Sequence, residues 1–392
     1  GLTATGADAY MLHVTTTPSV AYVTRVDNFD CGVMISASHN PFYDNGIKLI
    51  NSRGEKMDDE TIADIETYLD GNLAALGIEG DVPSAKREEL GEIVDYVSGR
   101  NRYVGYLISL AAHSYKKMRV GLDCANGSAW NIAKTVFEAL GAKTFVINAE
   151  PDGVNINDHC GSTHLDDLAQ KVVAGGYDIG VAFDGDADRC LLVDEQGGVI
   201  DGDKVLAVCG SDMKRRGKLS GGTIVATVMS NLGLHEFCRE NGVGLVCTSV
   251  GDRNVLEKMN ECGYKLGGEQ SGHTIFTDYA TTGDGQLTAL QFLDVLARSG
   301  KKASELASVC PQYPQVLLNV TVSHERGVKD AIMASDALSA AIAEEEGKLS
   351  GEGRVLVRPS GTEALIRVMV EAKTEQIALL AAENLVNVIK ML

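Results

Sequence analysis

Three aspartates alternate with small residues in Asp184-Gly185-Asp186-Ala187-Asp188-Arg189, directly after an apolar run that ends at Phe183. Alternate spacing in a loop places the carboxylates on one side, where they repel one another unless a cation lies between them. Carboxylate oxygens suit Mg²⁺ or Ca²⁺, so the segment predicts a cation site with positions left for phosphate or water. A solvated acidic loop is the alternative. A calcium EF-hand loop, with Glu195 at its twelfth position, is excluded because Arg189 replaces the glycine that its turn needs.

Ser38 follows a strand-like run, Val33 to Ile35, and a serine at a strand end can reach a cleft and carry a covalent intermediate. The G-x-S-x-G elbow of hydrolases is excluded, since Ser36 and Asn40 occupy its glycine positions. A plain polar turn before proline remains an alternative. Lys48 lies ten residues further on, across a turn, and can point back toward the same loop.

A third polar segment, Gly267 to His273, follows another predicted strand. Glu269, Ser271 and His273 alternate there, so their side chains can project together, and the flanking glycines allow close approach to a ligand. Carboxylate, hydroxyl and imidazole groups are suited to hydrogen bonding with sugar hydroxyls. A glycine-rich turn with a core histidine is the alternative interpretation.

The fourth segment combines a guanidinium, two hydroxyls and backbone N–H groups around a glycine, which together favour an anion site. Its members are Arg358, Ser360, Gly361 and Thr362. Arg367, nine residues after Arg358, would add a second positive charge. A β-turn between two strands is the alternative. One phosphate site, one cation site, one sugar-type loop and a serine predict phosphoryl transfer to or from a sugar phosphate.

The elements that must position these loops indicate a multidomain α/β protein, because 392 residues exceed the size of one core. Strands alternate with helices from 118 to 183 and again from 223 to 298, which is typical of parallel sheets. Helix-favouring sequence fills 56–112, and a single long helix is predicted over 328–346 before two further strands and a final helix. We predict four domains, at 1–114, 115–218, 219–311 and 312–392.

Composition restricts the partners. The formal charge of −19 disfavours nucleic acid and anionic membranes, so an anionic substrate needs a locally basic or cation-holding site. Nine scattered cysteines without a CxxC pair indicate reduced thiols and a cytoplasmic location. The apolar runs are too short to span a bilayer.

The four segments, in this order and at this spacing over essentially the whole chain, resemble the α-D-phosphohexomutases. The resemblance implies three related mixed or parallel α/β sandwich domains, the first one incomplete. It also implies a C-terminal α+β domain similar to the TATA-binding-protein fold. One Mg²⁺ per chain is implied, together with a hexose or hexosamine 1,6-bisphosphate as intermediate and activator.

The same resemblance implies residue roles. Ser38 is expected to carry the phosphoryl group and to complete the Mg²⁺ shell formed by Asp184, Asp186 and Asp188. The basic residues expected around the transferring group are Lys48 and Arg189, with His39 beside the phosphoserine. The sugar-contacting residues are expected to be Glu269, Ser271 and His273. The loop expected to grip the non-reacting phosphate comprises Arg358, Ser360, Gly361 and Thr362.

Within the family, Gln270 and the stretches 152–157, 160–164 and 250–253 are most similar to the bacterial phosphoglucosamine mutases. These interconvert glucosamine 6-phosphate and glucosamine 1-phosphate for cell-wall precursors. A phosphomannomutase or phosphoglucomutase is the alternative, as is an inactive sugar-phosphate-binding module. Ala364 stands where relatives often have proline, which alters loop stiffness and not chemistry.

The family's chain begins several dozen residues earlier than Gly1, so its first strand and an arginine-bearing loop have no counterpart here. We therefore expect an exposed apolar edge beside 33–35. Dimerisation or rearrangement would cover that edge, or else the 392 residues are a fragment of a longer protein. We expect the activity of this form to be far below that of a version that carries the family's N-terminal segment.

Overall fold

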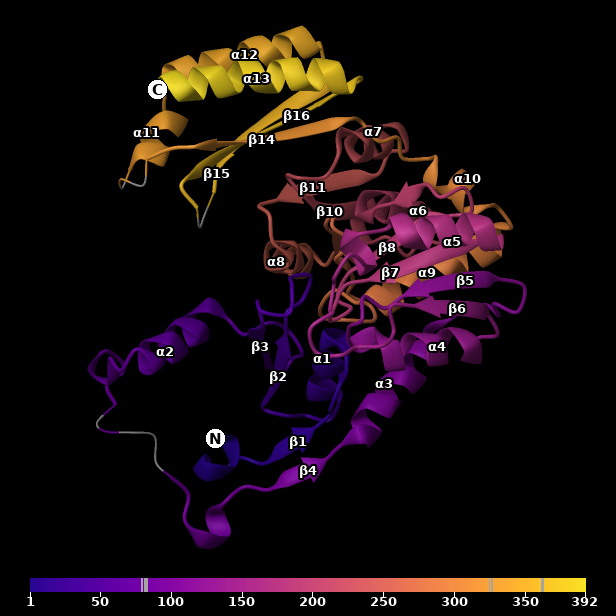
Figure 1. Ribbon diagram of the computed structural model, residues 1–392, viewed down its shortest axis with the longest axis vertical. Coiled ribbons are helices and arrows are strands. Elements are labelled where there is room, and N and C mark those ends of the chain that lie inside the picture. Colours follow the sequence, from indigo (N-terminus) through magenta and orange to yellow (C-terminus); the bar gives the residue numbers. More distant parts are fainter. Residues whose placement is uncertain (79, 81–83, 324, 326, 361–362) are drawn as a thin grey trace. The chain divides into compact units, whose positions relative to one another are not determined.

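The computed structural model describes residues 1–78, 80, 84–323, 325, 327–360 and 363–392. The chain forms two compact units, which are treated separately below. The first comprises residues 1–229 and 243–309, and the second comprises 230–242 and 310–392 (Figure 1). None of the described helices is long and apolar enough to cross a membrane.

The first unit begins with a small α/β region around a two-stranded antiparallel sheet, β2 (Cys31–Ser36) and β3 (Gly46–Asn51). Helix α1 (Thr17–Val26) packs Val20 and Ala21 against Ile50 on one face of this sheet. The helix starts where it does because the Thr16 side chain accepts the Ser19 N–H and a proline occupies its first turn.

The opposite face of β2 and β3 is apolar and exposed. Val33, Ile35 and Ile47 keep 43%, 69% and 69% of their surface accessible. Ile35 and Ile47 are direct cross-strand partners. These three residues form an exposed apolar face of the sheet, and the edge expected beside 33–35 stays a prediction.

The segment 56–112, whose sequence favours helix, contains among its described residues two α-helices, two short 3-10 helices and a short strand. Helix α2 (Asp59–Leu69) is capped by Asp58, and α3 (Val97–Leu110) packs against α1. Between them β4 (Ile93–Asp95) pairs in parallel with β1 (Ala9–Met11). The helical expectation was wrong for β4, because pairing with the remote β1 decides its conformation and no local pattern reports that.

A five-stranded sheet of order β6-β5-β7-β8-β9 carries the aspartate segment. The first three strands in that order are parallel, and β8 and β9 are antiparallel additions. The bounds are β5 Arg119–Asp123, β6 Lys143–Ile147, β7 Ile179–Phe183, β8 Cys190–Asp194 and β9 Val199–Ile200, with helices α4 (Ala133–Ala139) and α5 (Asp166–Gly175). Every residue of β7 is buried, as in a strand covered on both faces.

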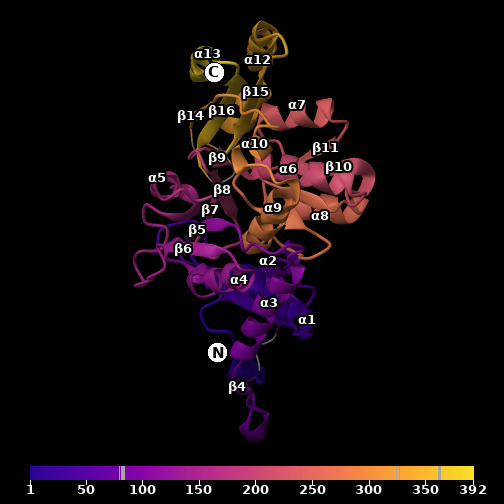
Figure 2. The same ribbon diagram turned by 90° about the vertical axis from the view of Figure 1, so that its right-hand side faces the viewer.

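A four-stranded sheet of order β11-β10-β12-β13 carries the sugar-type segment. Its bounds are β10 Thr223–Thr227, β11 Gly244–Thr248, β12 Leu266–Gly268 and β13 Thr274–Phe276, with helices α6 (Gly202–Arg215), α8 (Asp252–Cys262), α9 (Gly285–Ser299) and α10 (Ala303–Ala307). Helix α9 contacts β7 and β8 of one sheet and β13 of the other, so it joins the two sheets (Figure 2).

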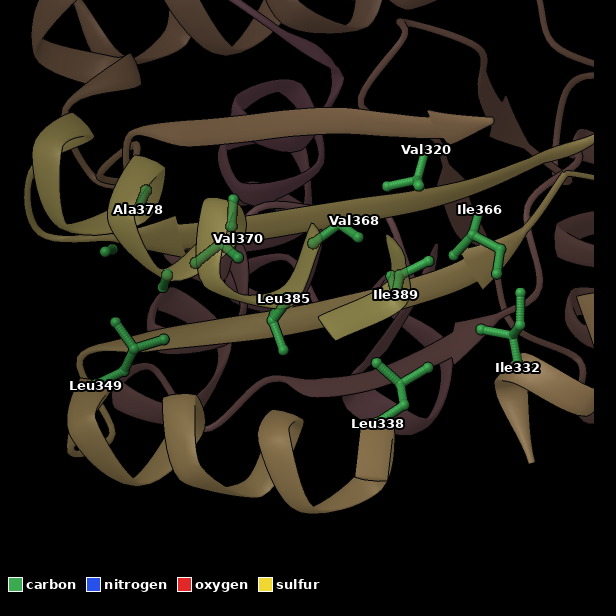
Figure 3. Close-up of a cluster of buried hydrophobic side chains, with 13 residues drawn as sticks. Val320, Ile332, Leu338, Leu349, Ile366, Val368, Val370, Ala378, Leu385 and Ile389 are labelled. Carbon is green, nitrogen blue, oxygen red and sulfur yellow. The ribbon is translucent and has the colours of Figure 1, made fainter. Parts of the chain in front are cut away.

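The second unit is an antiparallel sheet of order β14-β16-β15 with helices packed on its buried face. Val368, Val370 and Ile366 of the central strand pack against Leu385 and neighbouring helix residues (Figure 3). The bounds are β14 Gln315–Thr321, β15 Gly353–Pro359 and β16 Leu365–Ala372, with helices α7 (Leu232–Glu240), α11 (Val328–Met333), α12 (Asp336–Leu349) and α13 (Glu375–Met391).

The single helix expected over 328–346 is wrong. The chain leaves the helix after Met333, and Ser335 caps a new one by accepting the Ala337 N–H. A serine within an alanine-rich helical pattern can serve as a cap instead of an interior residue, which the periodicity alone did not distinguish.

Candidate active site

Asp184, Asp186 and Asp188 follow β7 and converge. One carboxylate oxygen of each lies within 4.8 Å of those of the other two, and all three residues are buried. Each also has one buried oxygen, Asp184 Oδ2, Asp186 Oδ1 and Asp188 Oδ1, without a hydrogen-bond partner among the described residues. Buried carboxylate oxygens normally have a partner, so these three fit the ligand set of a hard divalent cation.

The electrostatics of the three carboxylates are unequal. Burial, followed by the negative charges of Asp188 and Asp186, raises the pKa of Asp184 well above its ordinary value. Burial also acts to raise the pKa of Asp188, but the positive charge of Lys48 and then that of His273 outweigh it, so this pKa lies below its usual range. A bound cation would relieve the repulsion among the three groups.

Lys48 lies at the centre of this cluster. Its Nζ is 2.5 Å from Asp186 Oδ2, 2.9 Å from Asp188 Oδ2 and 3.5 Å from Ser38 Oγ. Burial acts to lower the pKa of Lys48. The carboxylates of Asp188 and Asp186 outweigh burial and raise this pKa above its ordinary value, so the ammonium stays charged. The structure thus brings the predicted serine, lysine and aspartates together from segments about 140 residues apart in sequence.

Ser38 adopts a left-handed backbone conformation, with φ of +53°. Its carbonyl accepts the Gly185 N–H at 3.0 Å and the side-chain amide of Asn157 at 2.8 Å. A side chain on Gly185 would begin 2.5 Å from that carbonyl, so only glycine allows the two loops to approach this closely. The aspartate loop and Asn157 together therefore hold the backbone of Ser38 in this conformation.

The remaining basic groups flank this cluster. The backbone N–H of Arg189 donates to Asp184 Oδ1 at 3.1 Å, and its Nε is buried without a partner among the described residues. His39 is exposed beside Ser38, and partial burial and then the charge of Arg189 lower its pKa. Thr17, which the sequence did not single out, donates its hydroxyl to Asp186.

The loop 269–273 forms the tip of the β12–β13 hairpin, where the Glu269 N–H donates to the His273 carbonyl at 2.9 Å. The Glu269 carboxylate accepts the Gly251 N–H at 3.0 Å, and Ser271 is exposed. The Cys190 N–H donates to the Gly272 carbonyl at 3.0 Å, which ties this loop to the strand that follows the aspartates.

His273 is buried, in contrast to Ser271, and its Nε2 lies 3.3 Å from Asp252 Oδ2. Asp252 is itself held by Lys56 Nζ at 2.6 Å. These three residues border a cleft of about 310 Å³ between β3 and α8. The sequence analysis predicted His273 as a sugar contact. It named the stretch 250–253 without a role for Asp252, and it did not name Lys56.

The predicted phosphate segment belongs to the second unit. Arg358 and Arg367 are direct cross-strand partners of β15 and β16, and burial and then the charge of Arg367 lower the pKa of Arg358. Ser360 is buried, and its carbonyl accepts from Lys329 Nζ at 2.6 Å. Gly361 and Thr362 lie outside the described residues. Lys329 is a third cation that the sequence analysis missed, because it lies 31 residues away in sequence.

Models of the phosphoglucomutase/phosphomannomutase family match this sequence in four consecutive segments. They describe alpha/beta/alpha domains I, II and III and the C-terminal domain, at residues 1–75, 101–198, 201–313 and 317–388 respectively.

Curated relatives extend the match over the whole chain. A protein named phosphoglucosamine mutase from Lachnospira eligens is 56% identical over 100% of this chain and 84% of its own length. A phosphoglucosamine mutase from Caldicellulosiruptor bescii is 49% identical over 100% of this chain and 85% of its own length.

Solved structures share the fold at low identity. A phosphoglucomutase/phosphomannomutase family protein from Burkholderia thailandensis matches with a TM-score of 0.79 and 23% identity, over 100% of this chain and 84% of that one. The N-acetylphosphoglucosamine mutase of Aspergillus fumigatus, solved with GlcNAc-6P and magnesium, matches with a TM-score of 0.74 and 20% identity, over 96% and 93% of the two chains.

Proposed function

Because this chain belongs to the phosphoglucomutase/phosphomannomutase family, we propose that it interconverts glucosamine 6-phosphate and glucosamine 1-phosphate through a phosphoserine. The observation that carries the proposal is the position of Lys48 Nζ, 3.5 Å from Ser38 Oγ and within hydrogen-bond distance of two aspartates. Phosphoryl transfer needs a hydroxyl, a positive charge and carboxylates that can bind a metal ion, all close together.

In the proposed reaction, phosphorylated Ser38 donates its phosphoryl group to the free hydroxyl of the sugar monophosphate. The bond between Ser38 Oγ and phosphorus breaks, a bond from the sugar oxygen to phosphorus forms, and the hydroxyl proton ends on Ser38 Oγ. The resulting 1,6-bisphosphate returns its other phosphoryl group to Ser38 by the reverse steps. Lys48 stabilises the negative charge that develops on the serine oxygen.

Asp184, Asp186 and Asp188 are proposed to hold one Mg²⁺, with the phosphate of Ser38 as a further ligand. When bound, Mg²⁺ offsets negative charge on the transferring group. The unpartnered carboxylate oxygens support this assignment. Arg189 and His39 are proposed to flank the same group, because both lie beside the serine and aspartate loops.

The sugar is proposed to be bound by Glu269, Ser271 and His273. Its non-reacting phosphate is proposed to bind Arg358, Ser360, Gly361, Thr362 and Arg367. The facing guanidiniums of Arg358 and Arg367 support the phosphate site, because two like charges on neighbouring strands are destabilising until an anion lies between them.

A coupled assay with three substrates tests the reaction. We expect turnover of glucosamine 1-phosphate to exceed that of mannose 1-phosphate and glucose 1-phosphate, and a 1,6-bisphosphate to activate the enzyme. Preference for either hexose phosphate would instead assign a phosphomannomutase or phosphoglucomutase. Binding of all three without turnover would indicate a sugar-phosphate-binding protein.

Two further proposals concern setting and assembly. Nine cysteines, all free in the structure, support a reducing, cytoplasmic location. The exposed apolar face formed by Val33, Ile35 and Ile47 supports a homodimer, which light scattering of the purified chain tests.

A further inference from the structure

A second cavity, of about 220 Å³, lies in the first unit at the opposite end of β12 from the loop 269–273. Its apolar lining residues include Met213 from α6 and Phe276 at the end of β13. Three cations line it, Arg216 and Lys218, which follow α6, and Lys265, which precedes β12. One carboxylate, that of Asp278, lines it as well. No residue assigned above to the metal, sugar or phosphate sites lines this cavity.

The positive charge around the cavity exceeds what its neighbours neutralise. Four of the five residues in 214–218 are cations, in a chain whose net charge is −19. Buried Asp212 pairs with Arg215, Arg216 and Arg298, so one carboxylate serves three guanidiniums. The partial negative charge at the C-terminal end of α6 neutralises a further part of this excess positive charge.

Lys218 lies beyond the end of α6 and has no carboxylate within 4 Å among the described residues. Lys265, by contrast, is paired with Asp278 at 2.8 Å. Gln291 of α9 also lines the cavity and is only 8% exposed.

We propose that this cavity is an accessory binding site for a small molecule carrying at least two negative charges, as phosphate or carboxylate groups. Lys218 and Arg216 bind the anionic groups, Gln291 donates its amide, and the apolar lining residues accept the body of the molecule. The loop 269–273 is the tip of the β12–β13 hairpin, and Phe276 belongs to the residue pair at the other end of that hairpin. Lys265 directly precedes this pair, so the ligand lies at the base of the hairpin that carries the sugar-type loop. The site is separate from the proposed catalytic centre.

Calorimetric titration of the full chain with pyrophosphate and with citrate, at constant ionic strength and with EDTA present, tests the proposal. The Arg358→Ala background weakens binding at the proposed phosphate loop. We expect saturable binding of at least one probe in that background. Lys218→Ala should weaken it about tenfold or more, as expected for loss of one charge-assisted contact. Lys218→Arg should retain it.

Lys301→Ala is the matched control, because Lys301 is an exposed lysine outside the cavity. It should leave binding unchanged, and Lys218→Ala should leave the basal mutase rate and the melting temperature unchanged. Absence of binding by both probes in the Arg358→Ala background would overturn the proposal. So would equal binding by the Lys218→Ala and Lys301→Ala proteins. Either result would leave the proposed mutase activity unaffected, so the two hypotheses fail separately.

Discussion

Asn157 fixes the loop that carries Ser38. Its side-chain amide donates to the Ser38 carbonyl at 2.8 Å and to the Asn40 carbonyl, also at 2.8 Å. Both carbonyls belong to the turn in which Ser38 has a positive φ, which is an uncommon conformation for serine. One amide thus bonds two successive parts of the turn and holds the serine hydroxyl toward the aspartates.

We therefore expect Asn157→Ala to lower kcat without abolishing folding. Two hydrogen bonds of about 1 kcal/mol each are lost, which corresponds to roughly a 10- to 30-fold loss if both act on the position of Ser38. Asn155→Ala is the matched control, since Asn155 bonds within the same loop but not to the serine turn. Equal effects of the two substitutions on kcat would show that Asn157 acts only through loop stability.

Ser38→Ala tests the covalent carrier. The variant keeps the sugar and metal sites but has no hydroxyl to hold the phosphoryl group, so we expect no mutase turnover and unchanged binding of the sugar phosphate. Intact-mass measurement should find a phosphate adduct on the parent protein after incubation with a 1,6-bisphosphate and none on the variant. A turning-over parent protein that never shows the adduct would contradict the role.

Removing Mg²⁺ tests the aspartate cluster. We expect EDTA to stop turnover and Mg²⁺ to raise the melting temperature, since a ligand that binds only the native state stabilises it. Asp186→Asn should weaken both effects, because one ligand oxygen loses its charge. The matched control is Asp166→Asn, an exposed aspartate at the start of α5, which should leave the response to Mg²⁺ unchanged. Turnover that persists in EDTA would exclude the cation.

The parts of this site that the sequence predicted are those whose residues lie in one short segment. The aspartates, the serine turn and the loop 269–273 each combine a recognisable spacing with an adjacent strand. Strands β10 and β11 lie within the alternation of strands and helices predicted over 223–298. Helix α6 was not predicted, although Asp201 caps it and basic residues occupy its last turn, which is a local signal that was available.

The parts that were missed depend on contacts between remote segments. Asn157 lies 119 residues from Ser38, and Lys56 lies 196 residues from Asp252. A single sequence gives no pattern that would predict either contact, because an asparagine in a loop and a lysine after a strand are both common. Such positioning residues become visible only when the fold brings their partners to them.

The second unit contains a buried ion pair whose loss should be costly. Glu371 is fully buried and accepts from Arg354 Nε at 2.7 Å and from the Leu232 N–H at 2.8 Å. Glu371→Ala leaves the guanidinium without its carboxylate, so we expect the free energy of unfolding to fall by about 3–5 kcal/mol. Denaturant unfolding measures it, with Glu352→Ala, which breaks an exposed pair with Lys373, as the control at about 1 kcal/mol or less. Equal losses would contradict the assignment.

Replacing Arg358 should lower the affinity for the sugar phosphate without lowering the stability of the ligand-free protein. The two residues face each other across β15 and β16, and Arg358 has no ion-pair partner among the described residues, whereas Arg367 is paired with Glu363 at 2.9 Å. A charge-assisted contact with phosphate contributes about 1.5–3 kcal/mol, so Arg358→Ala should raise the Michaelis constant for the sugar phosphate roughly 10- to 150-fold. The same change removes a repulsion between like charges, so the ligand-free protein should melt at an equal or higher temperature.

Arg358→Lys should recover part of the affinity, because lysine keeps the charge but cannot bind in a bidentate way. Lys373→Ala, an exposed cation of the same unit, is the control for a general loss of positive charge. An unchanged Michaelis constant for Arg358→Ala would exclude Arg358 from the phosphate site, and a marked fall in melting temperature would assign it a structural role instead.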